Sequence, residues 1–288
     1  MKILKELLSS TNDVLMGIKK RKDCDLKQLQ HFSNYSVIFI PCGKGVYHAD
    51  FGAFPFEGPT LVFSTPLQHM YIASDEDVSF VMLQFHGDFY CIEYHKEEVG
   101  CNGLLFNNIY TEPSINLNQA EANMFEILLK DVEKELRKAT PDEMVLISYL
   151  QLFLARSSSI KLKSLEKDRT LRQRDEQMEL FIQLLEKNYL TLHKPNDYAG
   201  LLAMSLNNFS KRCIRHFKKS PSAIIQERII LEAKKKLHLT RQSIKEIAYS
   251  LHFEDEYYFS RFFKKFTKVS PQMFRDKTGF SIVADLTG

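Results

Sequence analysis

The chain of 288 residues has no tryptophan, and it holds only 11 glycines and 9 prolines. This low glycine and proline content excludes collagen-like and low-complexity classes. Long apolar runs are also missing. The most apolar stretch, residues 145–155, is interrupted by Ser148, Tyr149 and Gln151, which leaves it short of the ~18 apolar residues of a membrane-spanning helix. Residues 1–17 mix charged and apolar side chains, unlike a signal peptide. We therefore expect a cytoplasmic protein that does not enter the membrane.

Cysteine is scarce and scattered. The five cysteines lie at positions 24, 42, 91, 101 and 213, without pairing or metal-ligand spacing. An odd, scattered set argues for a reducing cytosol and against a disulfide scaffold. The sequence also lacks a P-loop, a Rossmann fingerprint and a Ser-His-Asp pattern. We therefore expect no enzyme activity and no cofactor.

Acidic and basic residues are unevenly distributed. From Thr191 to the C-terminus there are 18 Lys and Arg against 9 Asp and Glu, which leaves 21 against 27 for the rest of the chain. The formal net charges of the two parts are therefore +9 and −6. A basic C-terminal third on an acidic body suggests an anionic partner for that third. A solvated charged face is the alternative explanation.

A pattern of two short helices occupies Ser243 to Arg275. Ser243 and Glu246 have the S-x-x-E spacing of a capping box, which starts a helix. Apolar residues then recur at helical spacing, and a second, basic helix follows the break at 251–253. One side of this second helix carries Phe259, Phe262, Phe263 and Phe266. Two short helices joined by a tight turn, the second of them basic, indicate a helix-turn-helix.

The same pattern occurs fifty residues earlier. Phe209 and Lys211 correspond to Phe259 and Arg261, and upstream of the turn the offset is 49. Two equivalent units within one hundred residues indicate an internal repeat. Between the units, Pro221 to Leu239 is expected to form a helix that Ser220 caps. Its apolar stripe consists of Ile225, Ile229, Ala233 and Leu237.

The stretch from Ser243 to Arg275 resembles the signature of AraC/XylS-type transcriptional regulators, and the resemblance extends from about Glu176 to Asp276. It implies a DNA-binding domain of two helix-turn-helix units joined by a long helix. It also implies double-stranded DNA and RNA polymerase as partners. Members of this family often carry an N-terminal cupin-like barrel, followed by helices used in dimerisation.

The chain departs from the family pattern at four positions. The family often has glycine at the turn of each unit, where this chain has Ala203 and His252. It also often has glycine before the Ser-Pro pair, where Lys218 and Lys268 stand. A residue other than glycine held at positive φ costs about 1 kcal/mol. We expect altered but intact turns, because the apolar residues on both sides of each turn remain.

The outward faces of the two second helices are the predicted base-reading surfaces. Asn suits adenine, and Lys and Arg suit guanine, while Glu256 would accept from cytosine and Tyr257 would pack on a thymine methyl. The predicted base-contacting residues are Asn207, Ser210, Lys211, Arg215, Glu256, Tyr257, Ser260 and Arg261. The lysines assigned to phosphates are Lys218, Lys219, Lys245, Lys264, Lys265 and Lys268. For any single residue of the first set, a solvated or phosphate-contacting role is the alternative.

The N-terminal half has a different texture. Short β-branched or aromatic runs at 37–40, 46–48, 61–63 and 80–85 are separated by residues 41–43, 54–59 and 74–77, where we expect turns. They predict a small barrel or sandwich whose interior has room for a small ligand. Residues 1–30 show weak helical periodicity. The predicted fold class is α+β with two domains: a small, cupin-like β-barrel with flanking helices, and an all-α C-terminal domain.

Two helices and a linker are expected between these domains. Asn118 with Glu121 marks the start of the first helix, and Thr140-Pro141 marks the start of the second. The second helix is apolar around most of its circumference, so it is buried either in the core or in a homodimer through residues 118–158. The polar run that follows predicts a linker. The expected domains are 1–158 and 176–288, with residues 159–175 as the linker.

The barrel has three possible roles. We expect it to bind a small-molecule effector, and His48, Asp50 and His69 are the candidate pocket residues. Alternatively, it only dimerises or contacts another protein. A metal-dependent cupin enzyme is the third reading, but Asp50 stands where such enzymes have a histidine ligand, so we expect no metal.

Overall fold

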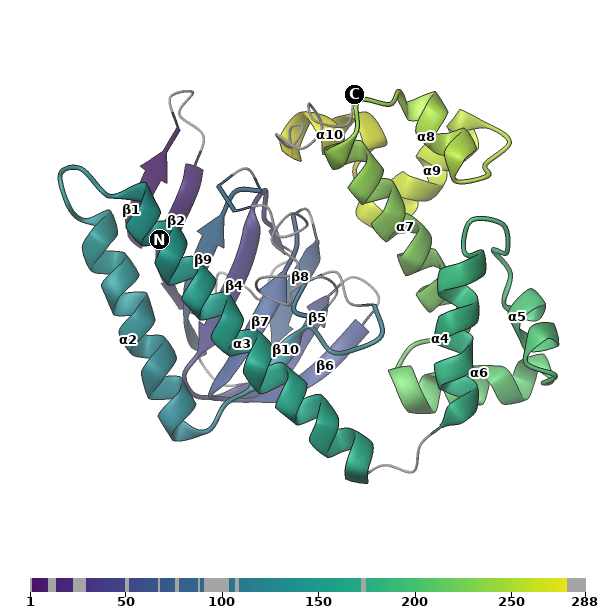
Figure 1. The fold of residues 1–288 in the computed structure, drawn as a ribbon, viewed down its shortest axis with the longest axis horizontal. Coiled ribbons are helices and arrows are strands. Elements are labelled where there is room, and N and C mark those ends of the chain that lie inside the picture. The colour runs from purple at the N-terminus through teal and green to yellow at the C-terminus, as the bar shows by residue number, and fades with distance from the viewer. Residues whose placement is uncertain are drawn as a thin grey trace. The chain divides into compact units, whose positions relative to one another are not determined.

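The computed structural model describes residues 2–9, 14–22, 30–49, 52–66, 68–75, 78–87, 89–90, 104–106, 109–171 and 175–278. The chain divides into two compact units, one of residues 1–108 and 112–165, the other of residues 109–111 and 166–288. Figure 1 shows strands and long helices in the first unit, and helices throughout the second. This division into a β-rich unit and an all-helical unit confirms the predicted fold class.

The strands of the first unit form two sheets. The six-stranded sheet has the order β1-β2-β9-β4-β7-β10, and the four-stranded sheet has the order β3-β8-β5-β6. Every neighbouring pair is antiparallel. The strands are β1 (Lys2–Leu8), β2 (Val14–Lys22), β3 (Gln30–His31), β4 (Tyr35–Ile40), β5 (Lys44–Ala49), β6 (Gly52–Glu57), β7 (Thr60–Ser64), β8 (His69–Ala73), β9 (Ser79–Phe85) and β10 (Ser114–Asn116).

Two of the sequence-based expectations for this unit are wrong. Residues 1–30 contain the strands β1 and β2 and no helix in their described part, because β2 pairs with β9 from Met16 to Lys22. Residues 54–59 were expected to separate strands, yet Phe54 and Phe56 are buried on alternate positions of β6. Pro55 is tolerated there because β6 lies at the edge of its sheet.

The six-stranded sheet is buried on both faces. Val37 and Phe39 of β4 belong to an apolar cluster that the sheet forms with two helices. Ile38 and Ile40 point to the opposite face, where they pack with Tyr47 and other residues of the four-stranded sheet. Alternation along the strand therefore gives three layers: helices, sheet and sheet. This double burial explains why β4 is apolar at successive positions from Val37 to Ile40.

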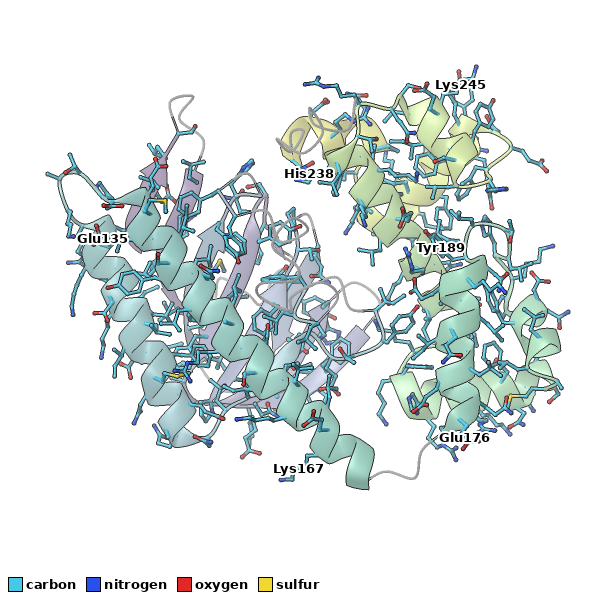
Figure 2. The ribbon with its side chains drawn as sticks, viewed as in Figure 1. Glu135, Lys167, Glu176, Tyr189, His238 and Lys245 are labelled. Carbon is cyan, nitrogen blue, oxygen red and sulfur yellow. The ribbon has the colours of Figure 1, made fainter. Side chains whose placement is uncertain are left out.

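The two helices of the first unit are α2 (Gln119–Leu136) and α3 (Glu143–Leu171). The predicted capping box of Asn118 and Glu121 is present at the start of α2. The predicted start of α3 at Thr140 is wrong by two residues, since the Asp142 carboxylate accepts from the backbone N–H of Met144 at 2.9 Å. Glu135, labelled in Figure 2, joins the two helices by accepting from the Asp142 backbone N–H at 3.1 Å.

Helix α3 continues through most of the predicted linker. Its apolar side is in the core of the first unit through Leu146, Leu150 and Phe153. Lys161 is also buried, and its ammonium donates to the carbonyls of Glu112 and Ser114 at 2.7 and 2.8 Å. The segment 159–171 is therefore helical, and its polar composition belongs to an exposed helix face. The boundary between the two units, at 165/166, lies within the predicted linker.

The second unit is built from seven helices in its described part. They are α4 (Glu176–Asn188), α5 (Pro195–Leu201), α6 (Leu206–Phe217), α7 (Pro221–Leu239), α8 (Ile244–Ser250), α9 (Glu256–Thr267) and α10 (Pro271–Thr278). Across the residues that the structure describes, no helix combines the length and apolarity needed to cross a membrane.

Candidate nucleic-acid interface

Helices α5 and α6 form the first helix-turn-helix. The Ser205 hydroxyl caps α6 by accepting from the backbone N–H of Asn208 at 3.3 Å. The buried side of α6 carries Phe209, Cys213 and Phe217, as the i, i+4, i+8 spacing predicts. Phe209 packs edge-on against Phe181 of α4, with ring centroids 4.9 Å apart. The packed side fixes which face of α6 remains at the surface.

Helices α8 and α9 form the second helix-turn-helix. The predicted capping box of Ser243 and Glu246 starts α8, and Asp255 caps α9 by accepting from the backbone N–H groups of Tyr257 and Tyr258. Phe259 and Phe263 are fully buried. The two helices therefore repeat the arrangement of α5 and α6.

The turns of the two units have the same hydrogen bonds. The Met204 backbone N–H donates to the Ala199 carbonyl at 2.9 Å, and the Phe253 N–H donates to the Ala248 carbonyl at 3.0 Å. The residue before each donor is left-handed, namely Ala203 with φ 52° and His252 with φ 58°. Both are positions where the sequence departs from the glycine of the family pattern. Both turns are therefore intact, as expected.

The end of each second helix is also repeated. Lys218 after α6 and Lys268 after α9 both have φ 59°. The Lys218 N–H donates to the Ile214 carbonyl at 3.1 Å, and the Lys268 N–H donates to the Lys264 carbonyl at 2.8 Å. This left-handed ending closes a helix in the usual way, but glycine is the residue that does so without strain.

Helix α7 joins the two units, as predicted. Ser220 caps it and Pro221 is its first residue. The predicted apolar stripe is buried in full: Ile225, Ile229, Ala233 and Leu237. The Arg275 guanidinium of α10 donates to the Leu237 and Gln242 carbonyls at 3.2 and 2.6 Å. These contacts hold the C-terminal end of α7 against α10, the helix that follows the second helix-turn-helix.

The predicted base-contacting residues lie on the surface of α6 and α9. Asn207, Lys211 and Arg215 are exposed on α6, and Ser210 is half-buried beside them. On α9, Tyr257 and Arg261 are exposed, while Glu256 and Ser260 are half-buried. The structure therefore places each set on one helix face, and the contacts with bases stay a prediction.

Five of the six lysines assigned to phosphates are exposed, and the sixth is not. The exposed ones are Lys218, Lys245, Lys264, Lys265 and Lys268, and Figure 2 labels Lys245 on α8. Lys219 is buried, and its ammonium pairs with Glu227 at 2.6 Å and donates to the Ile109 carbonyl at 3.2 Å. The phosphate assignment of Lys219 is therefore wrong, because its charge is already neutralised inside the unit.

Residues 109–111 belong to this helical unit although they precede β10 in the chain. The Tyr110 hydroxyl donates to Glu186 of α4 at 2.5 Å, and Glu186 also accepts from Arg228 of α7 at 2.9 Å. No motif in the sequence signals this segment, because three residues carry no periodicity.

Asp175 is a further residue that the sequence reading missed. It caps α4 by accepting from the Met178 backbone N–H, and it forms an ion pair with Arg212 of α6. Arg215, a predicted base reader, lies 3.5 Å from the same carboxylate. Burial by itself raises the pKa of Asp175, but the hydrogen bond and charge of Arg212 outweigh it, and the pKa lies below the usual value.

Of the candidate effector residues, only His48 has a side chain that the structure describes. His48 lies on the face of β5 opposite to the buried Tyr47 and stacks on Tyr71 at 4.1 Å. It therefore points away from the apolar interior, and its role in binding an effector stays a prediction. His69 lies on β8, and Asp50 lies outside the described residues. Within the described ranges, no three His, Cys, Asp or Glu side chains are grouped closely enough to hold a metal ion.

The C-terminal part of the chain matches a known protein family. Residues 198–277 match the family model described as a helix-turn-helix domain. The raffinose operon transcriptional regulatory protein RafR of Pediococcus pentosaceus is 26% identical over 130 residues, which are 45% of this chain and 43% of that protein. The chain thus matches less than half the length of this curated relative.

Two solved structures are also similar. Unsaturated fatty acid bound wild-type ToxT from Vibrio cholerae is 18% identical over 92% of this chain and 97% of that chain, with a TM-score of 0.42. The C-terminal domain of the response regulator yesN from Fusobacterium nucleatum is 24% identical over 35% of this chain and 99% of that chain, with a TM-score of 0.34. Together with the repeated geometry of α5–α6 and α8–α9, the family match identifies the C-terminal part of this chain as a helix-turn-helix domain of the AraC type.

Proposed function

We propose that this chain is a transcriptional regulator that binds double-stranded DNA with sequence preference through both helix-turn-helix units. One observation carries the proposal: two units with the same turns and caps each leave one polar, partly basic helix face exposed. A helix of this kind fits the major groove, whose base edges offer donors and acceptors. The proposed protein is a binding protein and not an enzyme, and it acts in the cytoplasm.

The two faces differ in chemistry. On α6, Asn207 and Lys211 are the proposed readers, and on α9 the equivalent positions hold Tyr257 and Arg261. Because α7 joins the units as one continuous helix, the two reading helices would enter successive major grooves about one helical turn apart. Each monomer would then recognise an asymmetric site made of two unlike halves.

The exposed lysines would supply most of the affinity. Lys218 and Lys268 stand at the ends of the two reading helices, and Lys245 and Lys265 lie on α8 and α9 of the second helix-turn-helix. Cationic side chains that neutralise phosphates release counterions, so binding weakens as salt rises. The net charge of +9 from Thr191 onward is consistent with this role.

The β-rich unit of residues 1–108 and 112–165 would regulate the helical unit. We propose that it responds to a small molecule, with RNA polymerase as a further partner of the whole protein. The second candidate is a unit that only dimerises or binds a protein. Exposed apolar side chains on α2 and α3 favour it, because Ile127, Met144 and Leu152 are 58%, 70% and 43% exposed. A thermal-shift screen separates the two, since only a sensing unit is stabilised by a small molecule.

Selection from a random pool of duplex DNA tests the proposal. We expect the full chain to enrich a defined sequence with two separated blocks of preferred bases, and its affinity to fall steeply between 50 and 200 mM salt, as for other proteins with several phosphate contacts. If no sequence were enriched over the starting pool at any salt concentration, the chain would not be a sequence-specific DNA-binding protein.

A further inference from the structure

We propose that Ile214 of α6 is a specificity-determining residue that contacts the 5-methyl group of a thymine in the major groove. This inference rests on the proposed function and adds a residue to the reading surface of the first helix-turn-helix. Ile214 lies in the third turn of α6 and is 54% exposed. None of the polar residues expected to read bases explains why a large aliphatic side chain stands at the surface there.

The spacing of Ile214 places it in line with the polar readers. Asn207, Ser210, Lys211 and Ile214 stand at i, i+3, i+4 and i+7, so they form one continuous row on the helix surface. In homeodomains, the helix in the major groove reads bases from four positions with this same spacing. The first three positions of the row are polar or charged, and Ile214 completes the row.

Ile214 does not belong to the buried side of α6. The helix packs through Phe209, Cys213 and Phe217, which are all buried. The side chain of Ile214 is not part of that stripe. Its backbone carbonyl accepts from the Lys218 N–H at the end of the helix. An isolated exposed isoleucine is common on protein surfaces, but this one lies within a basic face between Lys211 and Lys218.

The chemistry of the major groove indicates which group of the DNA Ile214 would contact. The methyl group of thymine is the apolar feature that the major groove presents, and aliphatic side chains contact it. An isoleucine cannot bond to donors or acceptors of the other bases. In the second helix-turn-helix the equivalent position holds Lys264, whose ammonium suits guanine or a phosphate. The two reading helices would therefore differ at this position as well.

The test compares thymine with uracil, which lacks only the methyl group. The probe is the duplex that the full chain selects from a random pool, with each thymine replaced in turn by deoxyuridine. One replacement in the block read by α6 should weaken binding by wild-type protein about fourfold, the value for one buried methyl group. In Ile214→Ala the same replacement should have no effect, although the variant binds the thymine duplex about fourfold more weakly.

The controls separate this inference from the proposed function. Leu180→Ala removes an aliphatic side chain that is 40% exposed on α4, which is not one of the two reading helices, and it should keep the wild-type response to deoxyuridine. If Ile214→Ala responded to every replacement as the wild-type protein does, Ile214 would read no methyl group, while sequence-specific binding would stand. If the wild-type protein selected no duplex, both the function and this inference would be wrong. Circular dichroism confirms that the variants fold.

Discussion

Ala203 and His252 lie 49 residues apart and share a left-handed backbone, with φ of 52° and 58°. Each donates its backbone N–H to a carbonyl three residues earlier, at 3.0 Å in both cases. The two residues mark the turns of two equivalent units. Neither residue is glycine, so each turn holds a residue with a Cβ at positive φ, a backbone conformation that favours glycine.

Replacing these turn residues by glycine should stabilise the helical unit. Ala203→Gly removes the strain of a Cβ at positive φ, and this gain exceeds the added freedom of the unfolded chain, so we expect about 0.5–1 kcal/mol more stability. His252→Gly should behave alike. Urea denaturation followed by circular dichroism measures the change. The matched control is Ala233→Gly inside α7, which should lose about 1 kcal/mol or more. Equal losses for Ala203→Gly and Ala233→Gly would contradict the left-handed turn.

The buried pair of Lys219 and Glu227 should be strongly coupled to stability. Both side chains are under one-tenth exposed, and removal of one partner leaves the other charge buried without compensation. We expect Lys219→Met to lower the free energy of unfolding by about 3–5 kcal/mol, and a second change, Glu227→Leu, to restore part of it. The exposed pair of Lys130 and Glu126 is the control, where Lys130→Met should cost about 0.5 kcal/mol or less. Similar small losses at both pairs would show that Lys219 is at the surface.

The Asp175 carboxylate should contribute stability that depends on pH. Its pKa lies below the usual value in the folded chain, so the contribution is present above the unfolded pKa and is lost as pH falls through the folded one. Asp175→Asn keeps a capping side chain but removes the charge, and we expect it to cost about 2 kcal/mol at pH 7. This difference from wild type should shrink progressively below about pH 4. A difference that is the same at pH 7 and pH 3 would mean that the charge of Asp175 contributes nothing.

Arg261 and Lys265 are four residues apart on α9 and should affect DNA binding differently. Arg261→Ala should weaken binding to the selected duplex by about 1–3 kcal/mol and relax the preference at one base. Lys265→Ala should weaken binding to all sequences alike and reduce the salt slope by about one. Titrations with selected and scrambled duplexes at several salt concentrations separate the two effects. If Arg261→Ala left both the affinity for DNA and the base preference unchanged, the second helix-turn-helix would read no bases.

The helical unit could be predicted from the sequence in more detail than the sheets. Its capping box, apolar stripes and repeat are short-range patterns, and even the strained positions Ala203 and His252 follow from the absence of glycine at the turns. The strand β2 was missed because its last four residues are charged and its conformation depends on pairing with the distant strand β9. Long-range pairing leaves little local signal.

The site shows the same limit. The exposed faces of α6 and α9 follow from helical spacing, but the burial of Lys219 does not. Its burial depends on Glu227 and on the carbonyl of Ile109, which is 110 residues away in the chain. The ion pair of Asp175 with Arg212 likewise joins residues 37 positions apart. A sequence pattern gives the side of a helix, while tertiary contacts decide which charges remain available to a partner.

Selection of duplex DNA by paired variants tests the central claim that one chain carries two unlike reading units. Random pools are selected with wild-type protein, with an Asn207→Ala/Lys211→Ala variant and with a Tyr257→Ala/Arg261→Ala variant. We predict that wild type selects two blocks of bases about one helical turn apart, and that each variant loses preference in a different block. Loss of the same bases in both variants, or a wild-type site with only one block, would contradict the account.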